Sequence, residues 1–152
     1  MEGKKILIAE DDDGIYELVS SDLIDDGWLV DRAETRAGVF AFLQEQQPYL
    51  LILDYLLPDM DGQELIELAG QKGIALPPFI VSTGRGDENL AVLMMKLGAR
   101  DYVVKDSFFL EHLNRAVKRL DTEISNKLML DLTRKALGVS EALLFGIFNQ
   151  AP

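Results

Sequence analysis

The sequence predicts an α/β fold in which helices cover both faces of a parallel sheet. Short apolar runs alternate along the chain with segments whose apolar residues recur every three or four positions, a pattern typical of βαβ units. The crossovers that join parallel strands are right-handed, and they place their helices on both sides of the sheet. The chain has 152 residues, 48% of them hydrophobic and 27% charged, which is enough to bury one core of ordinary size.

Five apolar runs are predicted to form the strands. They cover Lys4 to Ala9, Trp28 to Ala33, Tyr49 to Asp54, Pro78 to Thr83 and Asp101 to Lys105. Short continuous apolar runs of this kind are typical of strands that are buried on both faces. Pro48 and Pro77 each stand before one of the runs, and they support those two boundaries.

The segments between and after these runs are predicted to be amphipathic helices. Their apolar series run from Ile15 to Leu23, Val39 to Leu43, Leu65 to Ala69, Leu90 to Leu97 and Phe109 to Leu120. Each series steps by three or four residues, so each can lay one face against the sheet. Thr35 has the residue type of an N-cap and Gly98 that of a helix stop, which agrees with two of the predicted boundaries.

The last third of the chain predicts one long helix. Between Asp106 and about Leu137 there is no strand pattern and no strong helix breaker, and Gly138 follows as a stop. A helix of roughly thirty residues is about 45 Å long. We therefore expect a globular domain over residues 1–120 and a helical linker over residues 121–152.

This helix carries an apolar stripe that continues past the globular domain. The stripe consists of Leu113, Val117, Leu120, Ile124, Leu128 and Leu132. An isolated helix would leave the distal members of the stripe in water. A parallel coiled coil with a second copy would bury them, although Lys127 and Asp131 interrupt the seam. We therefore expect a homodimer through this helix.

Charge and composition argue against several kinds of partner. The formal net charge is -11, and phosphate backbones are bound by surfaces rich in Lys and Arg, so direct binding of nucleic acid is not expected. The chain has no cysteine, which suits a reducing compartment. The sequence shows neither a signal-peptide core nor an apolar run long enough to span a bilayer. We expect a cytoplasmic protein without membrane insertion.

Acidic, hydroxyl and basic side chains follow or end four of the five predicted strands. They are Glu10, Asp11, Asp12 and Asp13 after the first strand, Asp54 at the end of the third, Thr83 at the end of the fourth and Lys105 at the end of the fifth. In an open parallel sheet the ligand site lies beyond the carboxyl ends of the strands. The sequence therefore predicts that these groups meet at one edge of the sheet.

Such a cluster indicates Mg²⁺ and phosphoryl chemistry. Carboxylates that are brought together repel one another, and one of them takes up a proton unless a cation shares the site. Hard oxygen ligands select Mg²⁺ or a similar ion, and aspartate is an established nucleophile toward phosphoryl groups. Asp54 ends a buried strand, where a lone charge would be costly. We predict that Asp54 is the phosphoacceptor, with Lys105 and Thr83 holding phosphoryl oxygens.

The chain resembles the receiver domains of two-component response regulators from about Lys4 to Leu120. The matching segments are ILIAEDD with its acidic pair, LLILDYLLPDMDG around the acceptor, FIVSTG with its hydroxyl residue, and GARDYVVK with its aromatic residue and lysine. The resemblance implies a flavodoxin-like, doubly wound five-stranded parallel sheet of order 2-1-3-4-5. It also implies a histidine kinase or phosphotransfer protein as the partner that supplies the phosphoryl group.

The resemblance also implies a role for each site residue. Glu10, Asp11, Asp54 and the backbone carbonyl of Leu56 would be the Mg²⁺ ligands. Thr83 would be the switch hydroxyl, Tyr102 the aromatic residue that changes rotamer with it, and Lys105 the counter-charge of the phosphate. One position departs from the family pattern, because Asp106 follows the lysine where the family usually has a proline in a cis peptide.

Two other classes of function remain as alternatives. A Mg²⁺-dependent phosphatase with an aspartyl nucleophile needs a second acid two residues after the nucleophile, and Leu56 occupies that place. A structural pseudo-receiver is the second alternative, and the intact set of acidic, hydroxyl and lysine residues argues against it. We expect a signalling domain that catalyses only its own phosphorylation and dephosphorylation, and that controls a downstream module.

The tail carries a second resemblance. The segment SEALLFGIFNQAP, from Ser140 to Pro152, looks like the first helix of a PAS sensor domain. The chain is then expected to be a piece of a longer protein in which the long helix links a receiver to a PAS domain.

Overall fold

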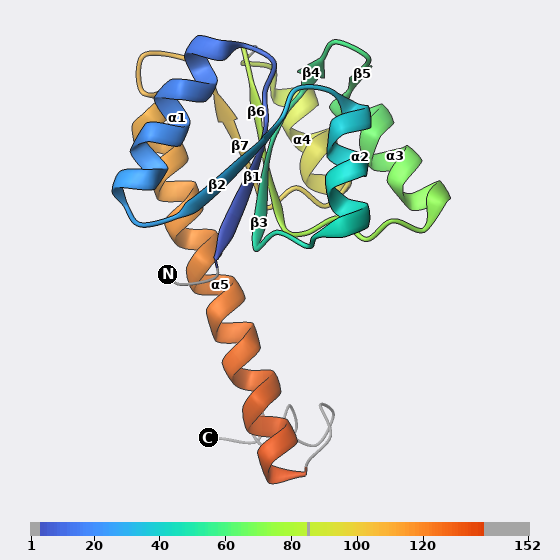
Figure 1. Ribbon diagram of the computed structural model, residues 1–152, viewed down its shortest axis with the longest axis vertical. Helices are drawn as coiled ribbons and strands as arrows, with labels where there is room; N and C mark the ends of the chain where they lie inside the picture. The colour runs from blue at the N-terminus through green and yellow to red at the C-terminus, as the bar shows by residue number, and fades with distance from the viewer. Residues whose placement is uncertain (1–3, 85, 139–152) are drawn as a thin grey trace. The chain divides into compact units, whose positions relative to one another are not determined.

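A five-stranded parallel sheet forms the centre of the computed structural model, which describes residues 4–84 and 86–138 (Figure 1). Its strands are β1 (Lys5–Ala9), β2 (Leu29–Ala33), β3 (Leu50–Asp54), β6 (Phe79–Thr83) and β7 (Asp101–Val104). The order is β2-β1-β3-β6-β7 and every pair is parallel. The predicted strand order 2-1-3-4-5 is confirmed, because β6 and β7 are the fourth and fifth strands of this sheet.

Helices cover both faces of the sheet, as predicted. α1 (Asp13–Asp25) and the start of α5 (Phe109–Leu137) lie on one face, and α2 (Arg36–Glu45), α3 (Gly62–Lys72) and α4 (Glu88–Lys96) lie on the other (Figure 1). The side chain of Thr35 accepts a hydrogen bond from the amide of Gly38, so the predicted N-cap of α2 is confirmed. Gly98 follows α4 with φ 110°, a conformation that favours glycine at a helix end.

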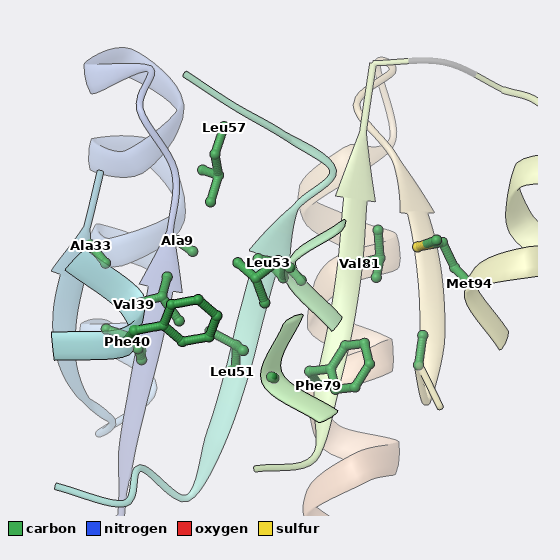
Figure 2. Close-up of a cluster of buried hydrophobic side chains, with 14 residues drawn as sticks. Ala9, Ala33, Val39, Phe40, Leu51, Leu53, Leu57, Phe79, Val81 and Met94 are labelled. Atoms are coloured by element: carbon green, nitrogen blue, oxygen red, sulfur yellow. The ribbon is translucent and has the colours of Figure 1, made fainter. Parts of the chain in front are cut away.

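The central strands are buried along their whole length. Every residue of β3 and β6 is buried, as expected for parallel strands covered on both faces. Figure 2 shows the side chains of Leu51, Leu53 and Val81 in one cluster with residues of α2 and α4. Burial of this apolar surface is the main force that holds the strands in their positions.

A short hairpin that was not predicted follows the acceptor strand. β4 (Leu56–Leu57) and β5 (Met60–Asp61) pair antiparallel, with Leu56 opposite Asp61. Two-residue strands carry no periodicity that a sequence pattern could reveal. The side chain of Leu57 is buried and the amide of Gly62 donates to the carbonyl of Tyr55, so the hairpin is anchored beside the end of β3.

The long helix α5 spans Phe109–Leu137 and has 29 residues, which corresponds to about 44 Å. It begins three residues after Asp106, because the carboxylate of that residue accepts from the amide of Phe108 and its carbonyl accepts from that of Phe109. Gly138 has φ 69° and is the predicted stop. The PAS-like segment from Ser140 onward lies outside the described residues, and its assignment stays a prediction.

The chain forms two compact units, Met1–Ala116 and Val117–Pro152. The boundary lies within α5, near the predicted division at residue 120. In the ranges that the structure describes, none of the helices combines the length and apolar character needed to cross a membrane.

Candidate functional site

Three carboxylates from two neighbouring strands meet at the carboxyl edge of the sheet. Glu10 and Asp11 follow β1, and Asp54 is the last residue of β3. β1 and β3 pair directly, with Ala9 opposite Leu53, so the residues that follow in each strand are side by side. One oxygen of each carboxylate lies within 4.8 Å of the other two. Glu10 and Asp54 are buried, whereas Asp11 is exposed.

The ammonium group of Lys105 joins two of these carboxylates. Its Nζ lies 2.6 Å from Oε1 of Glu10 and 3.1 Å from Oδ2 of Asp54. The side chains of all three residues are at most 13% exposed. Lys105 follows β7, and its amide donates to the carbonyl of Thr83 at a distance of 2.7 Å. The lysine is therefore attached to the end of β6 by its main chain while its side chain reaches β1 and β3.

Burial dominates the proton equilibrium of Asp54. Burial and a hydrogen bond with Glu10 raise the pKa of Asp54 from 3.8 to about 7, although the nearby charge of Lys105 lowers it. For Lys105, burial acts to lower the pKa, but the hydrogen bond with Glu10 and the charge of Asp54 outweigh it, and the pKa is raised. If both carboxylates were ionised, they would carry more negative charge than a single ammonium group compensates, which favours the retention of a proton on Asp54.

The acidic residues after Asp11 belong to the start of α1. The carboxylate of Asp12 accepts from the amide of Ile15 and caps the helix, and Asp13 is the first helical residue. The amide of Asp12 donates to Oε2 of Glu10 at 3.1 Å. The second oxygen of Glu10 is therefore already engaged by the backbone that leads into α1.

The other predicted site residues lie at the same edge. Thr83 is the last residue of β6 and is 2% exposed. Tyr102 of β7 is paired with Val81 of β6, and its side chain packs against the core cluster. Tyr102 therefore lies on the neighbouring strand, two residues before the position opposite Thr83. The amide of Leu56 donates to Oδ1 of Asp54 at 3.4 Å. The roles predicted for these residues, a switch pair and a carbonyl ligand, stay predictions.

The peptide that joins Lys105 to Asp106 is trans, since no peptide bond in the described ranges is cis. The amide of Asp106 donates to the carbonyl of Val104 at 2.9 Å. A proline has no amide hydrogen and could not make this bond. The residue that replaces the usual proline therefore adds a local backbone hydrogen bond. The contacts of Lys105 with the carboxylates are kept.

Sequence reasoning missed a contact that fixes the loop after the acceptor. Oδ1 of Asp59 accepts from the amide of Arg36 at 2.8 Å, and Oδ2 accepts from that of Ala37 at 3.3 Å. These amides open α2, and they lower the pKa of Asp59 by favouring its charged form. The sequence around Asp59 gives no sign of this contact, because its partner lies 23 positions earlier in the chain.

The comparisons with known proteins point to one family. The family described as response regulator receiver domain matches residues 6–118. The transcriptional regulatory protein KdpE of Mycobacterium tuberculosis is 35% identical over 117 residues, which cover 75% of this chain and 51% of the relative. The transcriptional regulatory protein FixJ of Rhizobium meliloti is 27% identical over 155 aligned positions, which cover 95% of this chain and 76% of the relative. The chain thus spans about half the length of KdpE.

Solved structures of the same kind share the fold. A CheY-like response regulator receiver domain protein from Methanospirillum hungatei superposes with a TM-score of 0.69 at 29% identity, over 82% of this chain and 98% of the other. The non-phosphorylated HemR receiver domain from Leptospira biflexa gives 0.66 at 28% identity, over 76% and 92%. With the family match over residues 6–118, these likenesses show that the chain belongs to the response regulator receiver domains of two-component signalling.

Proposed function

We propose that Asp54 accepts a phosphoryl group from a partner histidine kinase or phosphotransfer protein in a Mg²⁺-dependent reaction. The observation that carries the proposal is the position of Asp54: a buried carboxylate with a pKa of about 7, in contact with Lys105 and close to two further acids. A purely structural strand end would be more stable with an uncharged residue there. The arrangement is suited to the binding of a cation together with an anionic group.

The residues present fit a magnesium site. Three carboxylates whose oxygens lie within 4.8 Å of one another form the hard oxygen set that Mg²⁺ prefers. Glu10, Asp11 and Asp54 would hold the ion, together with the backbone carbonyl of Leu56. The bound ion would supply positive charge that offsets both the attacking carboxylate and the incoming phosphoryl oxygens.

In the proposed transfer an oxygen of Asp54 attacks the phosphorus atom of the donor. A new P–O bond forms to the carboxylate, the P–N bond to the donor imidazole breaks, and its electron pair leaves with the imidazole nitrogen. Lys105 then pairs with a phosphoryl oxygen, and the hydroxyl of Thr83 donates to another. Hydrolysis of the acyl phosphate returns Asp54 to its free form, so the chain modifies only itself and has no turnover of other substrates.

The signalling output is proposed to begin at Thr83 and Tyr102. Thr83 ends β6, the strand next to the acceptor strand β3, and Tyr102 lies on β7, the strand beyond β6. A phosphoryl group that draws the Thr83 hydroxyl toward it would leave space for the Tyr102 ring to change rotamer, and would bias the surface around β6 and β7. A downstream module would respond to that bias.

The proposal is tested by incubating the chain with Mg²⁺ and a small acyl phosphate. We expect the protein mass to increase by one phosphoryl group that hydroxylamine removes, and we expect no increase for Asp54→Asn. Label that persists in this variant, or no label on the wild-type chain, would contradict the proposal. The same experiment separates the alternatives, because a phosphatase would turn over phosphate esters and a structural module would do neither.

We also propose that the chain pairs with a second copy through the distal part of α5. Leu128 and Leu132, the distal members of the predicted stripe, are each more than half exposed, and they lie one turn apart on the same face of the helix. Burial of these side chains against the same face of another copy would remove them from water. Light scattering should give a dimer mass, and Leu128→Lys with Leu132→Lys should give a monomer; a wild-type monomer at high concentration would overturn the proposal.

A further inference from the structure

Arg32 makes an unusual set of contacts one strand away from the carboxylates. It lies in β2, opposite Ile8 of β1, and its side chain is 21% exposed. Its Nε donates to the backbone carbonyl of Glu10 at 3.0 Å. Its guanidinium carbon lies 4.5 Å from the centre of the Tyr16 ring in α1, within the range of a cation–π contact.

The charged end of the same side chain faces two acids. Nη2 of Arg32 lies 2.9 Å from Oδ1 of Asp13 and 3.5 Å from Oε1 of Glu34. Neither contact has the alignment of a hydrogen bond, and both acids are exposed, so these pairs alone would contribute little. The hydrogen bond from Nε is the directional contact of the guanidinium.

That hydrogen bond acts on the peptide that links two of the proposed Mg²⁺ ligands. Glu10 lies just past the end of β1, and its amide donates to the carbonyl of Ala33 at 3.0 Å. Its carbonyl belongs to the peptide that continues into Asp11. β2 therefore holds Glu10 at both ends, through Ala33 on one side and Arg32 on the other, and so sets the direction in which Asp11 leaves the strand.

We propose that Arg32 is a positioning residue of the Mg²⁺ site, which orients the peptide between Glu10 and Asp11 so that both carboxylates meet Asp54. The proposal rests on the proposed function for the identity of the ion. Asp11 needs such a constraint more than its neighbours do, because it is exposed while Glu10 and Asp54 are buried. A ligand whose direction is fixed before the ion binds loses less conformational freedom on binding.

The charge of Arg32 should act on Mg²⁺ affinity in the direction opposite to its hydrogen bond. A guanidinium near a cation site repels the cation, so removal of its charge alone should tighten Mg²⁺ binding. Removal of the hydrogen bond should weaken Mg²⁺ binding, because the Asp11 carboxylate is then free to turn away. A test must therefore change the charge and the donor separately.

Three substitutions of Arg32 separate the loss of charge from the loss of the hydrogen-bond donor, because their side chains place different atoms where Nε lies. In Arg32→Gln the side-chain nitrogen occupies the place of Nε, so the donor is kept and the charge is lost. In Arg32→Lys a methylene group occupies that place, so the charge is kept and the donor is displaced. Arg32→Met loses both. Lys5→Gln is the control for charge, since Lys5 lies at the other end of β1 and pairs with Asp31 at 2.8 Å.

The Mg²⁺ dissociation constant of the full chain is measured by titration calorimetry. The effect of the donor is read between proteins of equal charge. We expect a dissociation constant about fivefold higher for Arg32→Lys than for wild type, and about fivefold higher for Arg32→Met than for Arg32→Gln, the size of one lost hydrogen bond. Arg32→Gln itself should bind Mg²⁺ at least as tightly as wild type, and Lys5→Gln should bind it as wild type does. In metal-free protein, the ¹⁵N chemical shift of the Asp11 amide, which shares its peptide with the Glu10 carbonyl, should move in the Met and Lys variants and stay in place in the Gln variant. If Arg32→Met does not fold, Arg32→Lys gives the same comparison.

Several results would overturn the proposal. Binding of Mg²⁺ by Arg32→Lys as tightly as by wild type, or by Arg32→Met as tightly as by Arg32→Gln, would show that the hydrogen bond does not matter. Failure of the wild-type chain to bind Mg²⁺ would overturn both this proposal and the proposed function. If the wild type binds Mg²⁺ with the expected dependence on Arg32 but acquires no phosphoryl group from an acyl phosphate, only the proposed function fails.

Discussion

The ammonium group of Lys105 lies 2.6 Å from the carboxylate of Glu10, across two intervening strands of the sheet. The same group lies 3.1 Å from Asp54. Lys105 thus supplies positive charge between two buried acids, as a bound metal ion would. Lys105 and Mg²⁺ should therefore compete for the same carboxylates.

We predict that Lys105→Met binds Mg²⁺ about tenfold more tightly than wild type, which corresponds to about 1.4 kcal/mol and is the size of one charge interaction in a partly buried site. The same variant should accept a phosphoryl group more slowly, since the counter-charge of the phosphoryl oxygens is gone. Titration calorimetry and labelling by an acyl phosphate measure the two effects. Lys96→Met, in the last turn of α4, is the matched control, and weaker Mg²⁺ binding by Lys105→Met would contradict this account.

The raised pKa of Asp54 predicts a pH-dependent stability of the metal-free protein. The folded state keeps a proton on Asp54 up to about pH 7, whereas the unfolded chain loses it near 3.8. The folded state is therefore destabilised progressively as the pH rises from about 4 to 7, by a few kcal/mol in total, and the loss levels off above pH 7. Asp54→Asn removes the ionisation and should remove this dependence.

Urea unfolding in the presence of a chelator measures the effect. We expect Asp54→Asn to be more stable than wild type at pH 8, and we expect the difference to become smaller as the pH falls toward 5. Added Mg²⁺ should stabilise the wild type at pH 8 and have little effect on the variant, which lacks one charged ligand. An advantage of the variant that stays the same from pH 5 to 8 would show that burial does not raise this pKa.

Binding of Mg²⁺ should release a proton from Asp54. A carboxyl group must be ionised to ligate a metal ion, and the pKa of about 7 means that most Asp54 side chains are protonated at pH 6. The apparent affinity should therefore fall about tenfold per pH unit below pH 7 and become constant above pH 8. Calorimetry in two buffers of different ionisation enthalpy counts the protons; the same Mg²⁺ affinity at pH 6 and pH 8 would rule out this linkage.

Asp59 is predicted to stabilise the start of α2 and the loop after the acceptor. Its carboxylate accepts from the amides of Arg36 and Ala37, in the same way as an N-cap, and Asp59→Ala should lower the free energy of unfolding by about 1 kcal/mol. Because these amides lower its pKa, the contribution is present above the ordinary value of 3.8 and disappears only as the pH falls through the lowered value. Hydrogen exchange should show faster exchange at both amides.

A matched control for this prediction is Asp31→Ala. Asp31 pairs with Lys5 at 2.8 Å and is partly exposed, so its replacement removes an acid and an ion pair of the kind that contributes little. We expect a loss well below that of Asp59→Ala at pH 7. Equal losses in the two variants would mean that the two amide contacts of Asp59 add no stability.

The parts of the site that lie at strand ends could be predicted from the sequence. Parallel strands bring their carboxyl ends to one edge of the sheet, so the acids after the first predicted strand, Asp54 at the end of the third and Lys105 at the end of the fifth were expected to lie close together. The contacts of Lys105 with Glu10 and Asp54 follow from this rule. The cap at Thr35 and the stop at Gly138 followed from local backbone chemistry in the same way.

The contacts that join neighbouring elements to the site could not be predicted. Arg32 reaches the carbonyl of Glu10 across 22 positions, and Asp59 reaches Arg36 across 23. Both contacts join segments that are far apart in the sequence. They depend on the exact three-dimensional placement of these segments, which periodicity and residue type do not specify. In the sequence, Arg32 is a charged residue near the end of a strand, and no spacing rule relates it to Glu10.

The main-chain hydrogen bond between Lys105 and Thr83 has a mechanical consequence. With a length of 2.7 Å, it fastens the base of the lysine to the residue whose hydroxyl is proposed to respond to phosphorylation. A displacement of the β6 terminus would pull the lysine backbone along, and a lysine drawn toward a new negative group would pull the β6 terminus in return. The backbone of Lys105 and the carboxyl end of β6 would therefore move together.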